Sequence, residues 1–174
     1  VAMSKNARII IGDYYYMFNP HVQASILNKL ERELQDIIVV VDEGHNLPNR
    51  VTEMMSNNLT TNMIKNGLVE AKKYRYEGII VWLQDMMSIL NNLVGSEEKT
   101  VTREQFTNAL KVKVDYEELM NQLDLAAEEI RKKQRRSYLG GISAFLEAWE
   151  GPDDGFVRII AEHRSKYGPI ISLQ

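Results

Sequence analysis

Cysteine is absent from this chain of 174 residues. Without it, disulfides and thiolate metal sites are excluded, and nothing in the composition argues for an oxidising compartment, so a cytosolic protein is the default expectation. Long apolar runs are absent too. The longest are about five residues, against the roughly 20 that a membrane-spanning helix needs, and the start of the chain lacks the apolar core of a signal peptide. We therefore expect no function in a membrane.

A strong excess of charge of one sign is also missing, because 21 basic and 24 acidic residues leave a formal net charge of -3. No overall basic field indicates nucleic-acid binding, so any surface for nucleic acid has to be local. What the chain does have is apolar content: with 44% hydrophobic residues it can bury a proper core. We expect a globular protein of one domain, or one domain and a piece of another.

The first 46 residues follow the order strand, helix, strand. Residues 7–13, "ARIIIGD", are a short β-rich run, and residues 20–35 carry apolar side chains at helical spacing. Residues 37–41 are five β-branched apolar residues, which is typical of a strand covered on both faces in a parallel α/β sheet. Two strands cannot form a stable parallel sheet alone. Either they pair with the C-terminal "GPIISLQ" or the rest of the sheet is missing from this sequence, and we favour the second alternative.

After Pro48, about 100 residues show helical periodicity with almost no strand signal. Thr60, Thr61 and Thr102 are candidate helix caps. The last residues predict two short strands around a Tyr-Gly-Pro turn at 167–169. The fold class that we expect is mostly α, with a helical insertion flanked by a few strands of an α/β domain.

Two adjacent acids, Asp42 and Glu43, end the strand predicted at 37–41, and His45 follows them. Ligands of open parallel sheets bind at the carboxyl ends of the strands, where these acids fall. Adjacent carboxylates there suit nucleotide hydrolysis, because one can hold Mg²⁺ through water while the other orients or deprotonates the attacking water. The alternative is that Asp42 and Asn46 are only turn and cap residues at a strand-to-helix junction.

The string "VVVDEGHNLP", residues 39–48, resembles the Walker B segment of superfamily 2 helicases of the DEAH type, and in particular the iron-sulfur XPD (xeroderma pigmentosum group D) branch. Three other segments resemble that branch in the right order. Residues 7–20 resemble the segment between the iron-sulfur domain and Walker B, 137–149 the end of the helical Arch domain, and 168–174 the strand that re-enters the first motor domain. Gly44 departs from the pattern, since the family usually has Ala there, and we expect it to loosen the local backbone.

This resemblance implies a role for each residue of the acidic segment. Asp42 would bind the Mg²⁺ of Mg-ATP, Glu43 would activate the attacking water, and His45 would couple the nucleotide site to a neighbouring motif. It also implies a 4Fe-4S cluster in the full enzyme. Neither a glycine-rich phosphate loop nor the four cluster cysteines occur in this sequence, so we expect a fragment that does not hydrolyse ATP alone. Its parts would be a partial RecA-like motor domain 1 with the Walker B strand (1–46), the Arch domain (47–151) and strands returning to motor domain 1 (152–174).

Two basic runs with a tyrosine nearby, and two further tyrosines, are candidates for contact with DNA. Bases neutralise phosphates, and tyrosine rings stack on single-stranded bases. The tyrosines at the end of the first predicted strand lie near the path along which the family threads DNA. Ordinary alternatives stay open, because the helix dipole favours bases late in a helix and tyrosines also pack in cores. The candidates are Tyr14, Tyr16, Lys72, Lys73, Tyr74, Arg75, Arg131, Lys132, Lys133, Arg135 and Arg136.

The leading hypothesis is therefore a fragment of an ATP-dependent DNA helicase of the XPD type. The resemblance implies movement from 5' to 3' on single-stranded or forked DNA, in nucleotide excision repair, with repair or transcription-factor proteins as partners. The protein would be cytoplasmic and nucleoid-associated in a prokaryote, or nuclear in a eukaryote. A second hypothesis is a non-catalytic helical module that docks a partner protein. A bacterial-type relative of the same helicase branch is a third.

Overall fold

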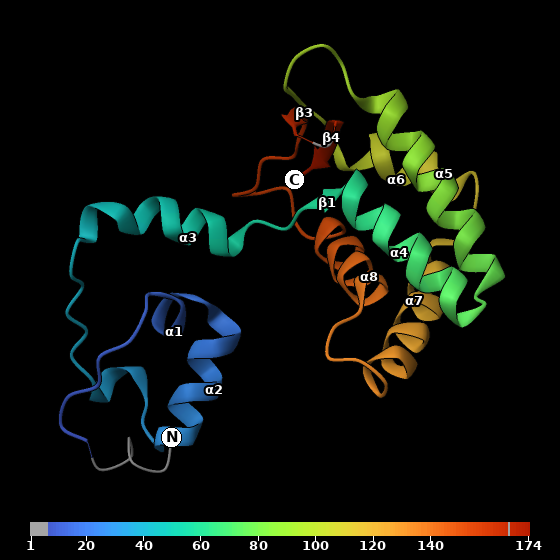
Figure 1. The fold of residues 1–174 in the computed structure, drawn as a ribbon. Coiled ribbons are helices and arrows are strands. Elements are labelled where there is room, and N and C mark those ends of the chain that lie inside the picture. Colours follow the sequence, from blue (N-terminus) through green and yellow to red (C-terminus); the bar gives the residue numbers. More distant parts are fainter. Residues whose placement is uncertain (1–6, 167) are drawn as a thin grey trace. The chain divides into compact units, whose positions relative to one another are not determined.

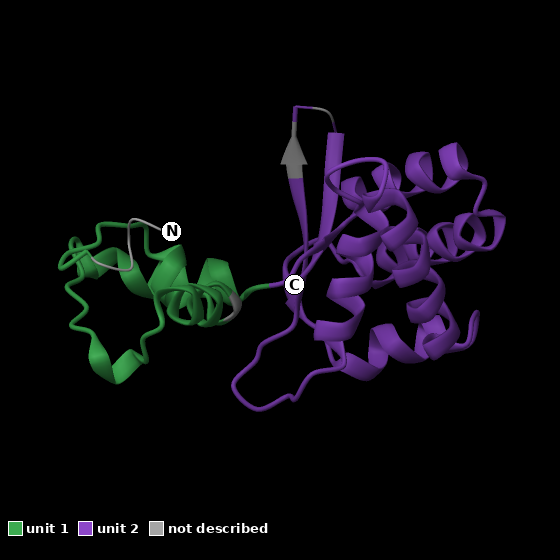
Figure 2. Cartoon of the chain, turned by 90° about the horizontal axis from the view of Figure 1, so that it is seen from below, with its two compact units in different colours: residues 1–56 green, residues 57–174 purple. Residues whose placement is uncertain are grey.

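The computed structural model describes residues 7–166 and 168–174. The chain divides into two compact units, residues 1–56 and 57–174, which Figure 2 shows in different colours. Helices dominate, and the strands of the described residues form one small antiparallel sheet (Figure 1). The prediction of a mostly α fold with a few strands is confirmed. No helix within these residues is long and apolar enough to cross a membrane.

Unit 1 is built from short helices. The helix predicted from residue 20 is present and ends earlier than expected, at Leu30. Its start follows from sequence, because the side chain of Asn19 accepts a hydrogen bond from the amide of Val22 at 3.2 Å and Pro20 occupies the first helical position. The helices of unit 1 are α1 (Tyr15–Phe18), α2 (Pro20–Leu30), the 3-10 turns η1 (Leu34–Asp36) and η2 (Gly44–Asn46), and α3 (Leu47–Met55).

The prediction of a buried parallel strand at 37–41 is wrong. Residues 7–13 and 37–41 form no strand, and most of their apolar side chains are exposed, with Ile11 at 94% and Ile38 at 93%. The β-branched residues favour an extended backbone, as at Ile37, but a strand also needs a hydrogen-bonded neighbour, and no described segment lies in that position. The sequence left two alternatives for these segments: pairing with the C-terminal residues, or a sheet whose other strands are missing from this sequence. The first is not observed.

Unit 2 contains the long helices of the chain. Four of these helices follow an N-cap residue whose side chain accepts a hydrogen bond from a backbone amide of the first turn. These residues are Thr60, Thr102, Asp115 and Ser137. The predicted caps Thr60 and Thr102 are thus confirmed, and Thr102 forms a reciprocal capping box with Gln105. The helices are α4 (Thr61–Tyr74), α5 (Glu77–Leu93), α6 (Arg103–Lys111), α7 (Tyr116–Arg131) and α8 (Tyr138–Trp149).

The sheet of unit 2 is antiparallel, with the order β1-β4-β3-β2. The two strands predicted near the C-terminus are confirmed, whereas Tyr167 of the predicted turn lies outside the described residues. The last strand pairs with the strand that precedes α4, with Leu173 opposite Leu59. Whether residues 152–174 also belong to a motor domain stays a prediction. The strands are β1 (Leu59–Thr60), β2 (Lys99–Thr100), β3 (Ile159–Ser165) and β4 (Gly168–Leu173).

Helix α8 packs against α4 and α7 (Figure 1). Gly67 permits a close approach of α4, since a Cβ at that position would come 2.9 Å from Cδ1 of Ile142 on α8. The other end of α8 carries Phe145 and Trp149, whose rings meet that of Phe106 on α6 with centroids 6.3 Å and 5.5 Å away. Interlocked side chains of this kind hold each helix in one position.

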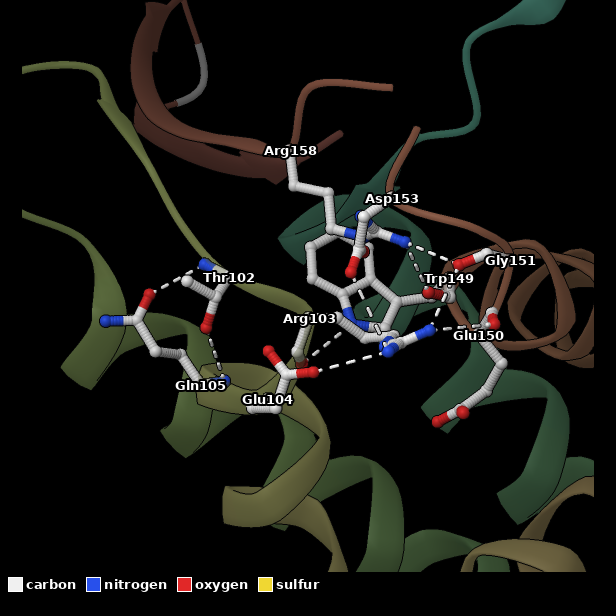
Figure 3. Close-up of polar contacts among 9 residues, drawn as sticks. All are labelled: Thr102, Arg103, Glu104, Gln105, Trp149, Glu150, Gly151, Asp153 and Arg158. Atoms are coloured by element: carbon white, nitrogen blue, oxygen red, sulfur yellow. Dashed lines mark hydrogen bonds and ion pairs between the residues drawn. The ribbon is translucent and has the colours of Figure 1, made fainter. Parts of the chain in front are cut away.

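Two arginines close the C-terminal end of α8 (Figure 3). Arg158 donates to the carbonyls of Trp149 at 3.1 Å and Gly151 at 2.9 Å, to the carboxylate of Asp153 at 2.7 Å, and lies over the indole ring, 5.2 Å from its centroid. Arg103, at the start of α6, donates to the carbonyl of Gly151 at 3.3 Å. The indole N–H of Trp149 donates in turn to the carbonyl of Arg103 at 3.2 Å. The bond from Arg158 satisfies the carbonyl of Trp149, the last residue of α8, which a helix end leaves without an intrahelical partner, and the other bonds fix the turn after α8 to the start of α6.

We expect Arg158→Ala to lower the free energy of unfolding of unit 2 by about 2–4 kcal/mol, because it removes a charged donor that is largely buried and leaves carbonyls without partners. Arg158→Lys should lose less, since the charge remains but the planar fork does not. Urea denaturation followed by circular dichroism measures the change. Lys132→Ala, at an exposed ion pair, is the control and should leave stability unchanged. Equal stability of Arg158→Ala and the wild-type chain would contradict the capping role.

Candidate functional site

The acidic segment of unit 1 forms a tight turn between residues 37–41 and the 3-10 turn η2. Asp42 and Glu43 are exposed at this turn. Glu43 has a φ of 51°, in the left-handed region that a residue with a Cβ adopts at an energetic cost. A side-chain oxygen of Asp42 accepts from the amide of Glu43 at 3.0 Å, and the amide of Asn46 donates to the carbonyl of Glu43 at 2.9 Å. The turn is therefore held by local hydrogen bonds.

His45 lies beside Glu43. Its Nδ1 is 3.2 Å from a carboxylate oxygen of Glu43, and both side chains are well exposed, at 72% and 65%. An exposed pair of this kind contributes little to stability, and both side chains are accessible to a ligand.

Gly44 stands where the resembling family usually has alanine, and this difference has a small steric effect. A Cβ at Gly44 would meet only Cγ1 of Val41 at 3.8 Å, an ordinary contact. An alanine would fit the same turn.

Tyr14 contacts this turn from the segment before α1. Its hydroxyl donates a hydrogen bond to the carbonyl oxygen of Asp42 and lies 3.3 Å from that of Glu43. Sequence reasoning placed Tyr14 among the DNA contacts and gave no sign of this bond, because 28 residues separate the partners. The ring of Tyr16 instead lies over Gly12. Within unit 1 the two predicted tyrosines thus have different surroundings, and Tyr14 is the one that reaches the acids.

The acidic turn fits a divalent cation that keeps most of its water. Among the described residues no group of three or more histidines, aspartates or glutamates is placed to hold a metal ion by itself. Mg²⁺ in nucleotide sites does not require such a cage, because one carboxylate, waters and the substrate phosphates complete its coordination. The exposed carboxylate of Asp42, with one oxygen engaged by the amide of Glu43, matches that donor set.

The two basic runs come together in unit 2. Lys72, Lys73 and Arg75 lie at the C-terminal end of α4, and the second run lies at the end of α7 and in the loop 132–137 that leads to α8. The hydroxyl of Tyr74 is 3.5 Å from Oε1 of Gln134 in that loop. We call the joint surface the basic end. It comprises Lys72, Lys73, Arg75, Arg131, Lys132, Lys133, Arg135 and Arg136.

Tyr74 lies between the two runs. Nζ of Lys73 is 5.1 Å and Nζ of Lys133 is 5.2 Å from the centroid of its ring, which is half-buried. Such cation–π contacts bring positive charge from both runs to one point. The ring thus already contacts two ammonium groups, whereas the sequence left open whether it stacks on a base or packs at a helix end.

Most bases of the basic end have no acidic partner. The exception is Lys132, whose Nζ lies 2.6 Å from Glu129; this hydrogen bond raises the pKa of Lys132 and lowers the pKa of Glu129. No carboxylate among the described residues lies within ion-pair distance of Lys72, Lys73, Arg75, Arg131, Lys133, Arg135 or Arg136. Uncompensated cations from two segments produce the local basic field that the overall charge of -3 conceals.

Comparison with known families supports a helicase domain in the first third of the chain. Residues 2–64 match the DEAD_2 family. This match supports a DEAD/DEAH-type helicase domain, with the ATP-dependent activity and the use of ATP, Mg²⁺ and nucleic acid that this type implies. It includes Asp42, Glu43 and His45, and it ends in the first turn of α4, before the basic end. A search of curated proteins found no match.

We expect Tyr14→Phe to loosen the acidic turn without unfolding unit 1, because only the hydrogen bonds of one hydroxyl to the turn are lost. The steady-state ¹H–¹⁵N NOE of residues 42–46 should fall, while that of α2 stays at its wild-type value. Tyr16→Phe is the matched control, since no hydrogen bond of its hydroxyl is found within the described part of the chain. If the two variants give the same NOE values, Tyr14 does not hold the turn.

Proposed function

We propose that this chain is part of an ATP-dependent DNA helicase of the iron-sulfur XPD type that moves from 5' to 3' in nucleotide excision repair. The observation that carries the proposal is the acidic turn of Asp42, Glu43 and His45 inside the segment that matches DEAD_2. Helicases of this type couple ATP hydrolysis to strand separation, and adjacent acids after an extended apolar segment suit that chemistry.

In this proposal each residue of the turn has one task. Asp42 would hold Mg²⁺ through its exposed carboxylate, and the bound ion would neutralise charge on the phosphates. Glu43 would orient the attacking water and accept its proton. His45, 3.2 Å from Glu43, would keep that carboxylate in place and link it to a neighbouring motif. The phosphate-binding loop that the reaction also needs does not occur in this sequence, so the chain alone would be inactive.

The exposed apolar segments of unit 1 support the view that further strands belong beside them. Contiguous exposed β-branched residues are unfavourable in water and form ready edges for strand pairing. A RecA-like sheet would cover them. The residues concerned are Ile9, Ile10, Ile11, Ile38, Val39 and Val40, exposed by 43% to 94%.

For unit 2 we propose the role of an Arch domain that guides single-stranded DNA. The support is the basic end, where two runs of cations with few acidic partners meet. The iron-sulfur cluster of this helicase type would depend on cysteines that this chain does not have. Repair or transcription-factor proteins as partners, and a nucleoid or nuclear location, are further predictions of the same proposal.

A second candidate is a helical module that docks a partner protein. It is favoured by the compactness of unit 2 on its own and by the position of almost all of this unit outside the DEAD_2 match. The two candidates differ in their salt dependence, because a surface that binds phosphates releases counterions and a protein-docking surface need not.

We expect Glu43→Gln to reduce ATP hydrolysis by the intact protein about 10²–10⁴-fold, since the variant cannot accept the proton of the attacking water. Binding of ATP should be retained, as the phosphates and Mg²⁺ are held by other groups. Glu53→Gln, at an exposed acid of α3 in the same unit, is the control and should hydrolyse ATP at the wild-type rate. A colorimetric phosphate assay measures the rates, and an unimpaired Glu43→Gln protein would refute the assignment.

We expect the chain to bind single-stranded oligothymidylate with an affinity that falls steeply with salt, with a log–log slope of about -0.7 for each phosphate contacted. The double charge reversal Arg135→Glu with Arg136→Glu should weaken binding at least tenfold. Lys111→Glu with Lys113→Glu changes the net charge equally at a different place and is the control. Fluorescence anisotropy measures the affinity of the wild-type chain and of the two double variants for the oligonucleotide. Binding by the wild-type chain that does not depend on salt would favour the docking module instead.

A further inference from the structure

Glu70 is the one charged residue that is buried among the described residues of unit 2. It lies on α4 and is only 5% exposed. A carboxylate removed from water is costly unless it is paired or accepts several hydrogen bonds. Within the described residues no lysine, arginine or histidine lies at ion-pair distance from it. Its charge is therefore stabilised by neutral donors.

Three donors reach Glu70 from the loop 132–137 and the first turn of α8. The hydroxyl of Ser137 and the amide of Leu139 each donate to Oε2 at 2.9 Å, and the amide nitrogen Nε2 of Gln134 donates to Oε1 at 2.6 Å. Leu139 belongs to the first turn of α8, where unpaired amides and the helix dipole favour a negative charge. The hydroxyl of Ser137 also caps α8, accepting from the amide of Gly140 at 3.2 Å. Glu70 thus fixes the start of α8 to α4.

Gln134 extends this network to the basic end. Besides Glu70, its Nε2 donates to the carbonyl of Arg136 at 2.8 Å, while its Oε1 lies 3.5 Å from the hydroxyl of Tyr74. Gln134 and Ser137, the two loop residues whose side chains Glu70 binds, bracket Arg135 and Arg136. The conformation of these two arginines relative to α4 is therefore set by a carboxylate that lies beneath them in the interior.

We propose that Glu70 is a positioning residue of the basic end: it anchors the loop 132–137 to α4, so that the two basic runs act as one binding surface for the phosphates of a single strand. The proposal rests on the nucleic-acid binding proposed above. Its physical basis is preorganisation, since a loop that is already ordered pays little conformational entropy when a phosphate chain binds. Cations of the two runs also repel each other, and the buried negative charge between them offsets part of that repulsion.

Two variants of the chain test this. Glu70→Gln keeps the shape of the side chain and removes the charge, and Gln134→Ala removes the link at a half-buried position without opening a cavity in the core. Gln122→Ala is the matched control, because Gln122 is exposed on α7 and its side chain makes no hydrogen bond within the described residues. Thermal denaturation checks that all three are folded, and fluorescence anisotropy with oligothymidylate measures affinity and salt dependence.

We expect Glu70→Gln and Gln134→Ala to weaken binding about five- to tenfold and to make the log–log salt slope shallower by about 1.4, the loss of two phosphate contacts. The charge reversal at Arg135 and Arg136 should then cost less in the Gln134→Ala background than in the wild-type chain, because those arginines are already displaced. If Glu70 and Gln134 were needed only for folding, their variants would change the melting temperature. The effects of Gln134→Ala and of the charge reversal on binding would then simply add.

The outcomes separate the two proposals. Wild-type chain that fails to bind oligothymidylate overturns the nucleic-acid proposal and this inference with it. Wild-type binding that responds to charge reversal at Arg135 and Arg136, together with folded Glu70→Gln and Gln134→Ala variants that keep the wild-type affinity and slope, overturns the role of Glu70 alone.

Discussion

The arrangement of unit 2 depends on the contact between Glu70 and the first turn of α8. Helix α8 packs against α4 and α7, and the buried carboxylate supplies acceptors for a backbone amide and two side chains at its start. A charge in this position excludes other registers of α8 on α4, because a shift would leave the carboxylate buried without donors. At the other end of α8, Arg158 donates to the carbonyl of Trp149, and both Arg103 and Arg158 donate to that of Gly151 just beyond the helix (Figure 3). Polar groups thus fix both ends of a helix whose middle is apolar.

Unit 1 is organised differently, because its most apolar segments have no neighbouring strand. Residues 7–13 and 37–41 form no strand and are mostly exposed, and the bond from Tyr14 to the carbonyl of Asp42 joins their ends. Together with the local hydrogen bonds of the turn, this contact holds the acidic residues in place without sheet hydrogen bonds. The strained backbone of Glu43 is the kind of feature that persists only when its surroundings hold it, and it falls on the residue proposed to activate water.

The two candidate sites lie in different units and rest on different support. The acidic turn lies within the DEAD_2 match, and its residues are consecutive in sequence. The basic end lies beyond that match and is assembled from segments about 60 residues apart. Chemistry that depends on adjacent residues is visible in a sequence, whereas a binding surface that depends on charge density arises only when distant helix ends meet.

Sequence alone determined the mostly α class, the caps at Thr60 and Thr102, the C-terminal strand pair and the acidic segment, because each depends on residues close together in the chain. It was wrong about a buried strand at 37–41, since β-branched residues favour an extended backbone but only a neighbouring strand makes a sheet. Tertiary structure alone decided the burial of Glu70, the bond of Tyr14 to the acidic turn and the union of the two basic runs. Those features depend on partners 28 to 69 residues away, and no local pattern distinguishes a glutamate that faces the core from one that faces water.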